Sequence, residues 1–166
     1  MIRIIYKYLI YIFIGFYLSL NNNYNQIVSS DYYFILNIPK INLSEKVYEY
    51  NDKNNDVNKG IFLAKEYNFN SFNGSLILAS HSGNSSISHF KNLDKLDKDD
   101  IVSIIIDNRV IYYKIVDIYK IQKNGKFKYS NENETIYLVT CDKKNNKKQI
   151  VFKGKIIKIN KKSQVF

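Results

Sequence analysis

The chain contains one cysteine and two histidines, the side chain types from which a nucleophilic site is commonly built. Cys141 ends the apolar run Leu138-Val139-Thr140, which indicates a buried strand. A thiol at a strand end is a candidate nucleophile, because a neighbouring base or cation can lower its pKa from about 8.5. The alternative interpretation of a lone cysteine is a small buried apolar side chain that takes no part in chemistry.

The first histidine, His81, offers a partner for this thiol. It follows the apolar run 76–80 and precedes Gly83. Two strand ends, one carrying a cysteine and the other a histidine, form a Cys-His site if the fold brings them together. The second histidine, His89, is predicted to be a solvated surface residue, because it lies out of phase with the apolar positions around it.

The composition favours strands, since 15 Tyr and 10 Phe occur with a single Pro. Strand-like runs cover residues 32–43, with Pro39 inside as the mark of an edge or a bend, and then 61–64, 76–79, 101–106, 110–121, 138–141 and 149–159. One short helical or 3₁₀ segment is predicted over 87–96, where Ile87, Phe90, Leu93 and Leu96 recur every three residues. About eight strand-like runs predict an all-β fold, a closed or nearly closed barrel, because closure removes exposed strand edges.

The first 20 residues differ from the rest of the chain. Arg3 and Lys7 are their only charges, and the apolar stretch of about 19 residues approaches the length needed to cross a bilayer. We expect an uncleaved signal anchor over 1–20, a polar linker over 21–30 and one folded domain over 31–166. Basic residues at the amino end place the domain outside the cell membrane. A cleaved signal peptide and a buried helix are the alternatives.

The formal net charge of +10 raises the question of nucleic-acid binding. Only Arg3 and Arg109 among the 25 basic residues are arginine, the residue that base readout uses most, and the lysines are scattered. We therefore predict no nucleic-acid partner. A weak attraction to an anionic membrane or cell-wall polymer stays open.

With these features in place, the chain resembles the sortases, cysteine transpeptidases of the Gram-positive cell surface. Five segments carry the resemblance in the family's order: 38–43 as the first strand, 79–82 as the histidine motif, 90–93 as the segment after it, 138–141 as the nucleophile motif and 149–157 as the final strand.

The resemblance implies an eight-stranded barrel with a Cys-His-Arg site that cuts a C-terminal sorting signal of the Leu-Pro-x-Thr-Gly type. Cys141 would form a thioester with the signal. His81 would protonate the leaving amine and later deprotonate the incoming one, an amine of a cell-wall precursor or a pilin. The implied partners are thus secreted proteins with a sorting signal, their amine acceptors, and the membrane through residues 1–20.

The chain departs from the family pattern at the arginine. That position opens the last strand, five residues before the small residue matched by Gly154, and here it holds Gln149. Three explanations stay open: Gln149 takes the role, Lys148 supplies the charge after a one-residue shift, or efficient catalysis is lost and the domain only binds sorting signals. We favour Gln149 beside His81 and Cys141. Arg109, at a predicted hairpin turn, is expected to be a surface residue.

Some sortases bind calcium through acidic residues of two adjacent loops. Candidate acids in suitable loops are Asp52, Asp56, Glu66, Glu132 and Glu134. They are scattered among many lysines and lack the spacing of an EF-hand loop. We therefore predict neither a metal nor another cofactor.

Overall fold

The computed structural model describes residues 31–124, 127 and 129–161. The predicted signal anchor over 1–20 and the linker over 21–30 lie outside these residues. Within the described part of the chain, no helix is long and apolar enough to cross a membrane.

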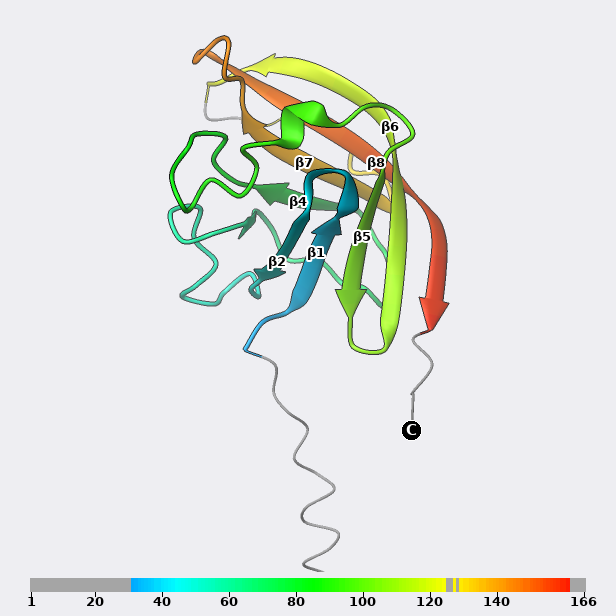
Figure 1. The fold of residues 1–166 in the computed structure, drawn as a ribbon. Helices are drawn as coiled ribbons and strands as arrows, with labels where there is room; N and C mark the ends of the chain where they lie inside the picture. The colour runs from blue at the N-terminus through cyan, green and yellow to red at the C-terminus, as the bar shows by residue number, and fades with distance from the viewer. Residues whose placement is uncertain (1–30, 125–126, 128, 162–166) are drawn as a thin grey trace, which may run out of the picture. The chain divides into compact units, whose positions relative to one another are not determined.

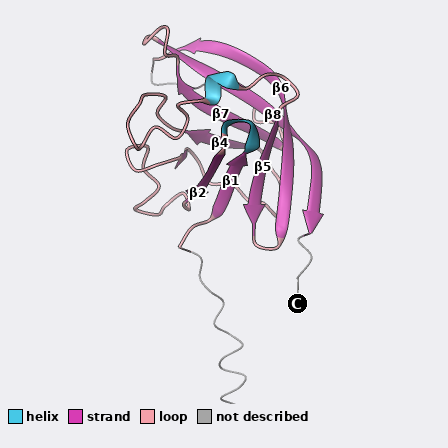
Figure 2. Ribbon diagram, viewed as in Figure 1, coloured by secondary structure: helices cyan, strands magenta, loops and turns pink. Residues whose placement is uncertain are grey.

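The described residues form an all-β fold (Figures 1 and 2). Its strands are β1 (Phe34–Ile38), β2 (Leu43–Val47), β3 (Phe62–Leu63), β4 (Ser75–Ala79), β5 (Ile101–Ile106), β6 (Arg109–Gln122), β7 (Thr135–Cys141) and β8 (Lys148–Lys161). They make one eight-stranded sheet in the order β2-β1-β5-β6-β8-β7-β4-β3. A bridge between Val47 and Ile61 joins the two edges, so the sheet is a nearly closed barrel. The predicted fold class is confirmed for this part of the chain.

Pro39 explains the shape of the first strand region. The chain bends there through the 3₁₀ turn η1 (Pro39–Ile41), and Asn42 adopts the left-handed conformation before β2 begins. Proline cannot donate a ladder hydrogen bond, so one continuous strand is not formed. The predicted bend is confirmed, and it separates two antiparallel strands, β1 and β2.

The segment 87–96 was predicted to be helical or 3₁₀, and the structure forms the 3₁₀ turn η2 (Leu93–Lys95) in it. The regular part is shorter than the predicted range. The apolar side chains Phe90, Leu93 and Leu96 are buried against the barrel core, as the spacing indicated. A spacing of three residues brings side chains to one face of a short 3₁₀ turn as well as of a helix, so burial needs no longer regular element.

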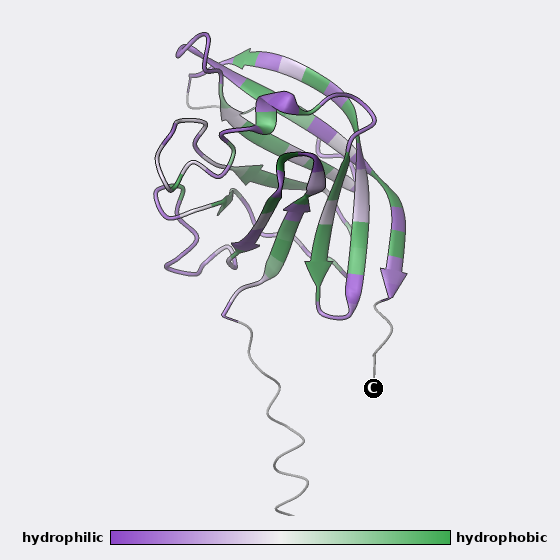
Figure 3. Ribbon diagram, viewed as in Figure 1, coloured by the Kyte–Doolittle hydropathy of each residue, from purple (hydrophilic) through white to green (hydrophobic). Residues whose placement is uncertain are grey.

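The strands that carry the candidate site have two apolar faces. Leu76, Leu138 and Phe152 point into the barrel interior, together with the main core. The alternate residues Ile77 and Val139 belong to a second, smaller cluster on the outer face. Figure 3 shows this difference as nearly continuous apolar colour on β4 and alternation along β6 and β8. The outer cluster is the surface on which the site is built.

Candidate active site

The fold brings the predicted nucleophile and its histidine to neighbouring strand ends. β4 runs parallel to β7, with Ala79 opposite Val139, and each strand leads into its functional residue two positions later. The Ser80 amide donates to the Val139 carbonyl at 3.3 Å, and Thr140 Oγ1 donates to the Ser80 carbonyl at 2.8 Å. His81 and Cys141 therefore follow two strands whose ends are held together.

The thiol and the imidazole are both partly exposed, so a substrate can reach them. Among the described residues no hydrogen bond joins the imidazole to the Cys141 sulfur. Nε2 of His81 instead lies 3.4 Å from Oδ1 of Asn58, in the loop between β2 and β3. Catalytic hydrogen bonds are often long or absent before a substrate binds.

The strand register decides which residue of β8 faces the thiol. Cys141 lies directly opposite Gln149 in the antiparallel β7-β8 pair. Directly opposed side chains share one face of a sheet, with Cβ atoms about 5 Å apart. Lys148 is adjacent to Gln149 in the same strand and projects to the other face. Of the two candidates for the arginine position, the fold places Gln149 beside the thiol.

An apolar surface formed by a mostly buried cluster lies on the outer face of the sheet, the face that Cys141 shares with Val139. The centre of the cluster consists of Ile77, Tyr137, Val139 and Val151, each at most 5% exposed, with Ala64, Ala79, Tyr119 and Ile121 packed around it. Phe127 and Tyr129, from the connection between β6 and β7, stack on one another with ring centroids 5.5 Å apart and pack on this cluster. The partly buried residues around the centre are therefore the ones that a bound peptide could contact.

The end of the β6-β7 connection is held in place by Glu132. Its carboxylate accepts hydrogen bonds from Lys153 at 2.7 Å and from Ser130 at 2.5 Å, and it pairs with Lys155 at 2.6 Å. The Lys153 and Lys155 ammonium groups and the Ser130 hydroxyl lower the pKa of Glu132 to about 2. Two lysines thus neutralise the Glu132 carboxylate, one of the acids considered for calcium.

The other acids considered for calcium have local structural partners or remain apart. Asp52 and Asp56 accept backbone hydrogen bonds from Asn54 and Asn58, at 2.7 and 2.8 Å, within the β2-β3 loop. Across the described ranges, no group of three or more His, Cys, Asp or Glu side chains is arranged to hold a metal ion.

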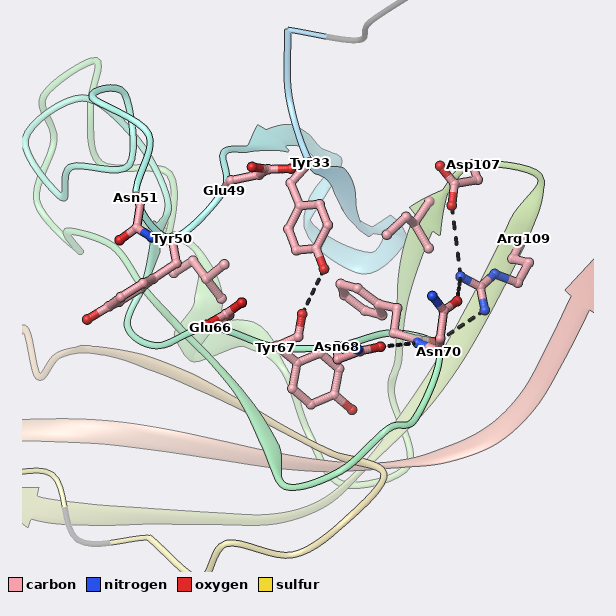
Figure 4. Close-up of a pocket in the computed structure, with 13 residues that line it drawn as sticks. Tyr33, Glu49, Tyr50, Asn51, Glu66, Tyr67, Asn68, Asn70, Asp107 and Arg109 are labelled. Atoms are coloured by element: carbon pink, nitrogen blue, oxygen red, sulfur yellow. Dashed lines mark hydrogen bonds and ion pairs between the residues drawn. The ribbon is translucent and has the colours of Figure 1, made fainter. Parts of the chain in front are cut away.

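Arg109 was predicted to be a surface residue, and this prediction is wrong. Its side chain is 22% exposed and donates to the Phe69 carbonyl and to Oδ1 of Asn70, both at 3.1 Å. Figure 4 shows it at the edge of a cavity of about 300 Å³ with Asp107 beside it. Arg109 begins β6, whereas Ile121, near the other end of that strand, pairs with Gln149. It anchors the β3-β4 connection far from Cys141 and does not replace the missing arginine.

His89 was predicted to be solvated and is instead half-buried. Its side chain is 19% exposed, and Nδ1 lies 3.1 Å from Oε1 of Glu45 on β2. Glu45 belongs to β2, an edge strand of the sheet, whereas Cys141 ends β7. His89 therefore pairs with a carboxylate and not with the Cys141 thiol. The sequence analysis likewise did not assign His89 to the Cys-His site.

The sequence analysis missed three residues that contact the site. Asn58 lies in a loop of Asn, Asp and Lys, where nothing distinguishes it from its neighbours. Lys120 and Asp142 form an ion pair of 2.7 Å beside Cys141. The position of Asp142, next to the only cysteine, was the one available signal.

Comparison with known proteins assigns the chain to a family. The sortase domain family model matches residues 36–157, and the chain belongs to the sortase family. A search of curated protein sequences finds no match.

Solved structures of sortases share the fold. Sortase A of Listeria monocytogenes superposes with a TM-score of 0.68 at 19% identity, covering 81% of this chain and 93% of that one. Sortase C-3 of Streptococcus pneumoniae gives 0.66 at 23% identity, with 84% and 71% covered. A sortase D5 transpeptidase of Clostridium perfringens gives 0.64 at 22% identity, with 77% and 80% covered.

Proposed function

We propose that this protein is a sortase-type cysteine transpeptidase. Its substrate would be a Leu-Pro-x-Thr-Gly-like sorting signal at the C-terminus of a secreted protein. The observation that carries the proposal is that Cys141 ends β7 opposite Gln149 of β8, while His81 follows β4, the parallel neighbour of β7. Membership of the sortase family supports the same chemistry.

The reaction would consist of two acyl transfers. The Cys141 thiolate attacks the carbonyl carbon before the scissile bond, the carbon–nitrogen bond breaks, and His81 gives its proton to the leaving amine. A second amine then attacks the thioester, loses a proton to His81 and releases the thiolate. Because the thioester preserves the acyl group, an amine can accept it in place of water.

Gln149 would stabilise the oxyanion that forms in both steps. Its amide N–H groups are hydrogen-bond donors, and the register places this side chain on the same face as the thiol. A donor of this kind is worth a few kcal/mol to a transition state that carries negative charge. An amide supplies no formal charge, and this is the basis of the alternative that the domain only binds sorting signals. Under that alternative the peptide binds and no thioester forms.

The acceptor would be an amine of the cell wall or of a pilin, and the site would lie outside the cell membrane, attached through residues 1–20. Support for this placement is the charge pattern of the N-terminal sequence, with Arg3 and Lys7 ahead of the uncharged run. Protease accessibility of the domain in intact cells tests it, because an internal domain would be protected.

The test of the activity is to incubate the full-length protein with a sorting-signal peptide and trap the thioester by mass spectrometry. We expect an acyl adduct on Cys141 that disappears when an amine is added. Cys141→Ala should form no adduct, and His81→Ala should lose turnover. Wild-type turnover by both variants would refute the proposal, whereas peptide binding without an adduct would support the binding-only alternative.

A further inference from the structure

Asp142 is an acidic residue directly after the nucleophile, and its carboxylate is almost completely buried. Its side chain is 3% exposed, less than any other carboxylate that forms an ion pair in the described chain. Oδ2 accepts from Nζ of Lys120 at 2.7 Å, and Oδ1 accepts from the Lys144 amide at 3.0 Å. These two bonds, that from Lys120 first, hold the pKa of Asp142 below its usual value, so the group carries a negative charge at neutral pH.

Lys120 reaches Asp142 from a different strand. It lies on β6 opposite Ile150 of β8, and its side chain crosses the start of β8 toward the end of β7. Lys120, Cys141 and Asp142 all line one cavity of about 380 Å³. The two charges are therefore neighbours of the thiol, on the side of the sheet away from the outer apolar surface.

The Asp142 carboxylate also takes part in the turn that joins the two strands of the site. This turn begins directly after Cys141 and ends directly before Lys148, which opens β8. Within it, Oδ1 of Asp142 accepts the hydrogen bond from the Lys144 amide, and main-chain bonds join Asp142 to Lys148 at 3.0 Å and Asn145 to Asp142 at 3.2 Å. The carboxylate that pairs with Lys120 is therefore fixed at the end of the strand that carries the thiol.

A negative charge next to a thiol disfavours the thiolate and raises the thiol pKa, and a positive charge does the opposite. The Asp142 side chain is 3% exposed and the Lys120 side chain 47% exposed, so water screens the carboxylate less than the ammonium group. An unpaired Asp142 carboxylate would thus reduce the fraction of Cys141 present as the nucleophile. Lys120 cancels this charge at the carboxylate itself.

We propose that Lys120 is a charge-balancing and positioning residue for Cys141, acting through its ion pair with Asp142. The role of this ion pair in catalysis rests on the proposed transpeptidase function. The effect of the ion pair on the thiol is independent of that function, because the ionisation of Cys141 can be measured without a peptide.

The other charged or titratable groups near the thiol are His81, Asp94, Lys143 and Lys144. His81 approaches from the end of β4, on the outer face. Asp94 and Lys143, at the rim of the shared cavity, pair with each other at 3.3 Å, and Lys143 also donates to the Lys91 carbonyl. Lys144 adds a weaker attraction to Asp142. Lys120 is thus the one ammonium group hydrogen-bonded to the Asp142 carboxylate among the described residues.

The experiment measures the rate of alkylation of the full-length protein by iodoacetamide between about pH 5 and pH 10, a range that spans the pKa of a thiol. Cys141 is the only cysteine, so the signal has a single source. Lys120→Met should move the midpoint of the rate profile up by about one pH unit, and Asp142→Asn should move it down. The double variant should return close to the wild-type midpoint.

Opposite shifts that cancel in the double variant are the signature of charge balance. Damage to the turn alone would shift or slow both single variants in the same direction, and that result would overturn the proposal, as would two unchanged midpoints. Lys120→Met leaves a buried carboxylate unpaired and can impair folding. If Lys120→Met does not fold, Asp142→Asn is compared with the double variant instead. The double variant should have the higher midpoint of the alkylation profile, and equal midpoints would contradict the proposal.

Two further variants complete the comparison. Lys120→Arg keeps the charge and should keep the wild-type midpoint. Lys98→Met removes an ion pair to Asp117, also on β6, at 3.1 Å with both side chains exposed, and should leave the midpoint unchanged. A shift in Lys98→Met equal to that in Lys120→Met would contradict the proposal, because it would show a general effect of lost positive charge.

Activity on a sorting-signal peptide separates this proposal from the proposed function. Lys120→Met should lower kcat at neutral pH about tenfold with little change in KM, since one unit of pKa is a tenfold change in thiolate. If the wild type shows no turnover while the alkylation shifts are present, the transpeptidase function fails and the charge balance stands. If turnover occurs and the shifts are absent, the charge balance fails alone.

Discussion

Thr140 donates a hydrogen bond of 2.8 Å to the carbonyl of Ser80, which ties the residue before the nucleophile to the residue before the histidine. Thr140 is 4% exposed, so water does not compete for this bond. The bond lies just beyond the last paired residues of β4 and β7, Ala79 and Val139. It extends the contact between the strands to the position where the functional side chains begin.

Replacing Thr140 tests this link. Thr140→Val keeps the shape and removes the hydroxyl, so the Ser80 carbonyl loses its donor, and we expect the free energy of unfolding to fall by about 1 kcal/mol. The kcat for thioester formation should fall as well, because the ends of β4 and β7 are no longer fixed. Thr140→Ser retains the donor and serves as the control in denaturant titrations and peptide assays. A Val variant equal to wild type in both would show that the bond has no role.

The role of Gln149 is tested by comparison with its neighbour. Gln149→Ala should lower kcat about a hundredfold or more, as expected when an oxyanion donor is lost. Lys148→Ala should have little effect, because Lys148 projects to the other face of β8. Gln149→Arg should retain turnover, since guanidinium is also a donor. A greater loss in Lys148→Ala than in Gln149→Ala would reverse the assignment.

The sequence predicted the β-barrel because alternation and turn residues are local signals that survive in the fold. It also predicted Cys141 and His81 as partners, and the parallel pairing of β4 with β7 brings the two strand ends together. The roles of Arg109 and His89 were not predictable, because their partners, Phe69, Asn70 and Glu45, are distant in sequence and the contacts depend on how loops close over the barrel. Over 87–96 the spacing left a helix and a 3₁₀ segment open, and the structure forms a short 3₁₀ turn because burial of the apolar side chains needs no more.

Glu132 makes stability depend on pH. Its pKa is lowered to about 2 by Lys153, Lys155 and Ser130, below the ordinary value of 4.5 expected in the unfolded chain. A group with a lowered folded-state pKa contributes stability that is present above its unfolded pKa and lost as the pH falls toward its folded pKa. We expect the difference in unfolding free energy between wild type and Glu132→Gln to be constant above about pH 5.5 and to shrink between about pH 4.5 and pH 2. Denaturant titrations across this range measure it, and a difference that grows on acidification would contradict the assignment.

Gly154 is packed too closely to accept a side chain. A Cβ atom there would lie 2.8 Å from Cγ2 of Ile136 and 3.4 Å from the Lys114 carbonyl. Both neighbours belong to paired strands, so neither can move freely, and Gly154→Ala should destabilise the fold by about 1–3 kcal/mol. Gly83→Ala is the matched control, because a Cβ atom there meets only Ser88 Oγ, at 3.5 Å. Thermal unfolding of the two variants should separate them, and equal melting temperatures would show that β8 relaxes to make room.

The aromatic pair of the β6-β7 connection should determine how tightly the peptide binds. Phe127 stacks on Tyr129 and also contacts the Tyr137 ring edge-on, with centroids 5.6 Å apart, so its ring covers the apolar surface that leads to Cys141. Phe127→Ala removes contact area for the peptide and leaves His81, Cys141 and Gln149 unchanged. We expect KM for a sorting-signal peptide to rise about tenfold or more, since a lost aromatic contact is worth one or more kcal/mol, with kcat nearly constant. Tyr50→Ala, an exposed tyrosine beside the cavity of Arg109, should change neither constant. A fall in kcat at unchanged KM would instead show that Phe127 acts on the chemical step, and a lower KM would show that its ring obstructs the peptide.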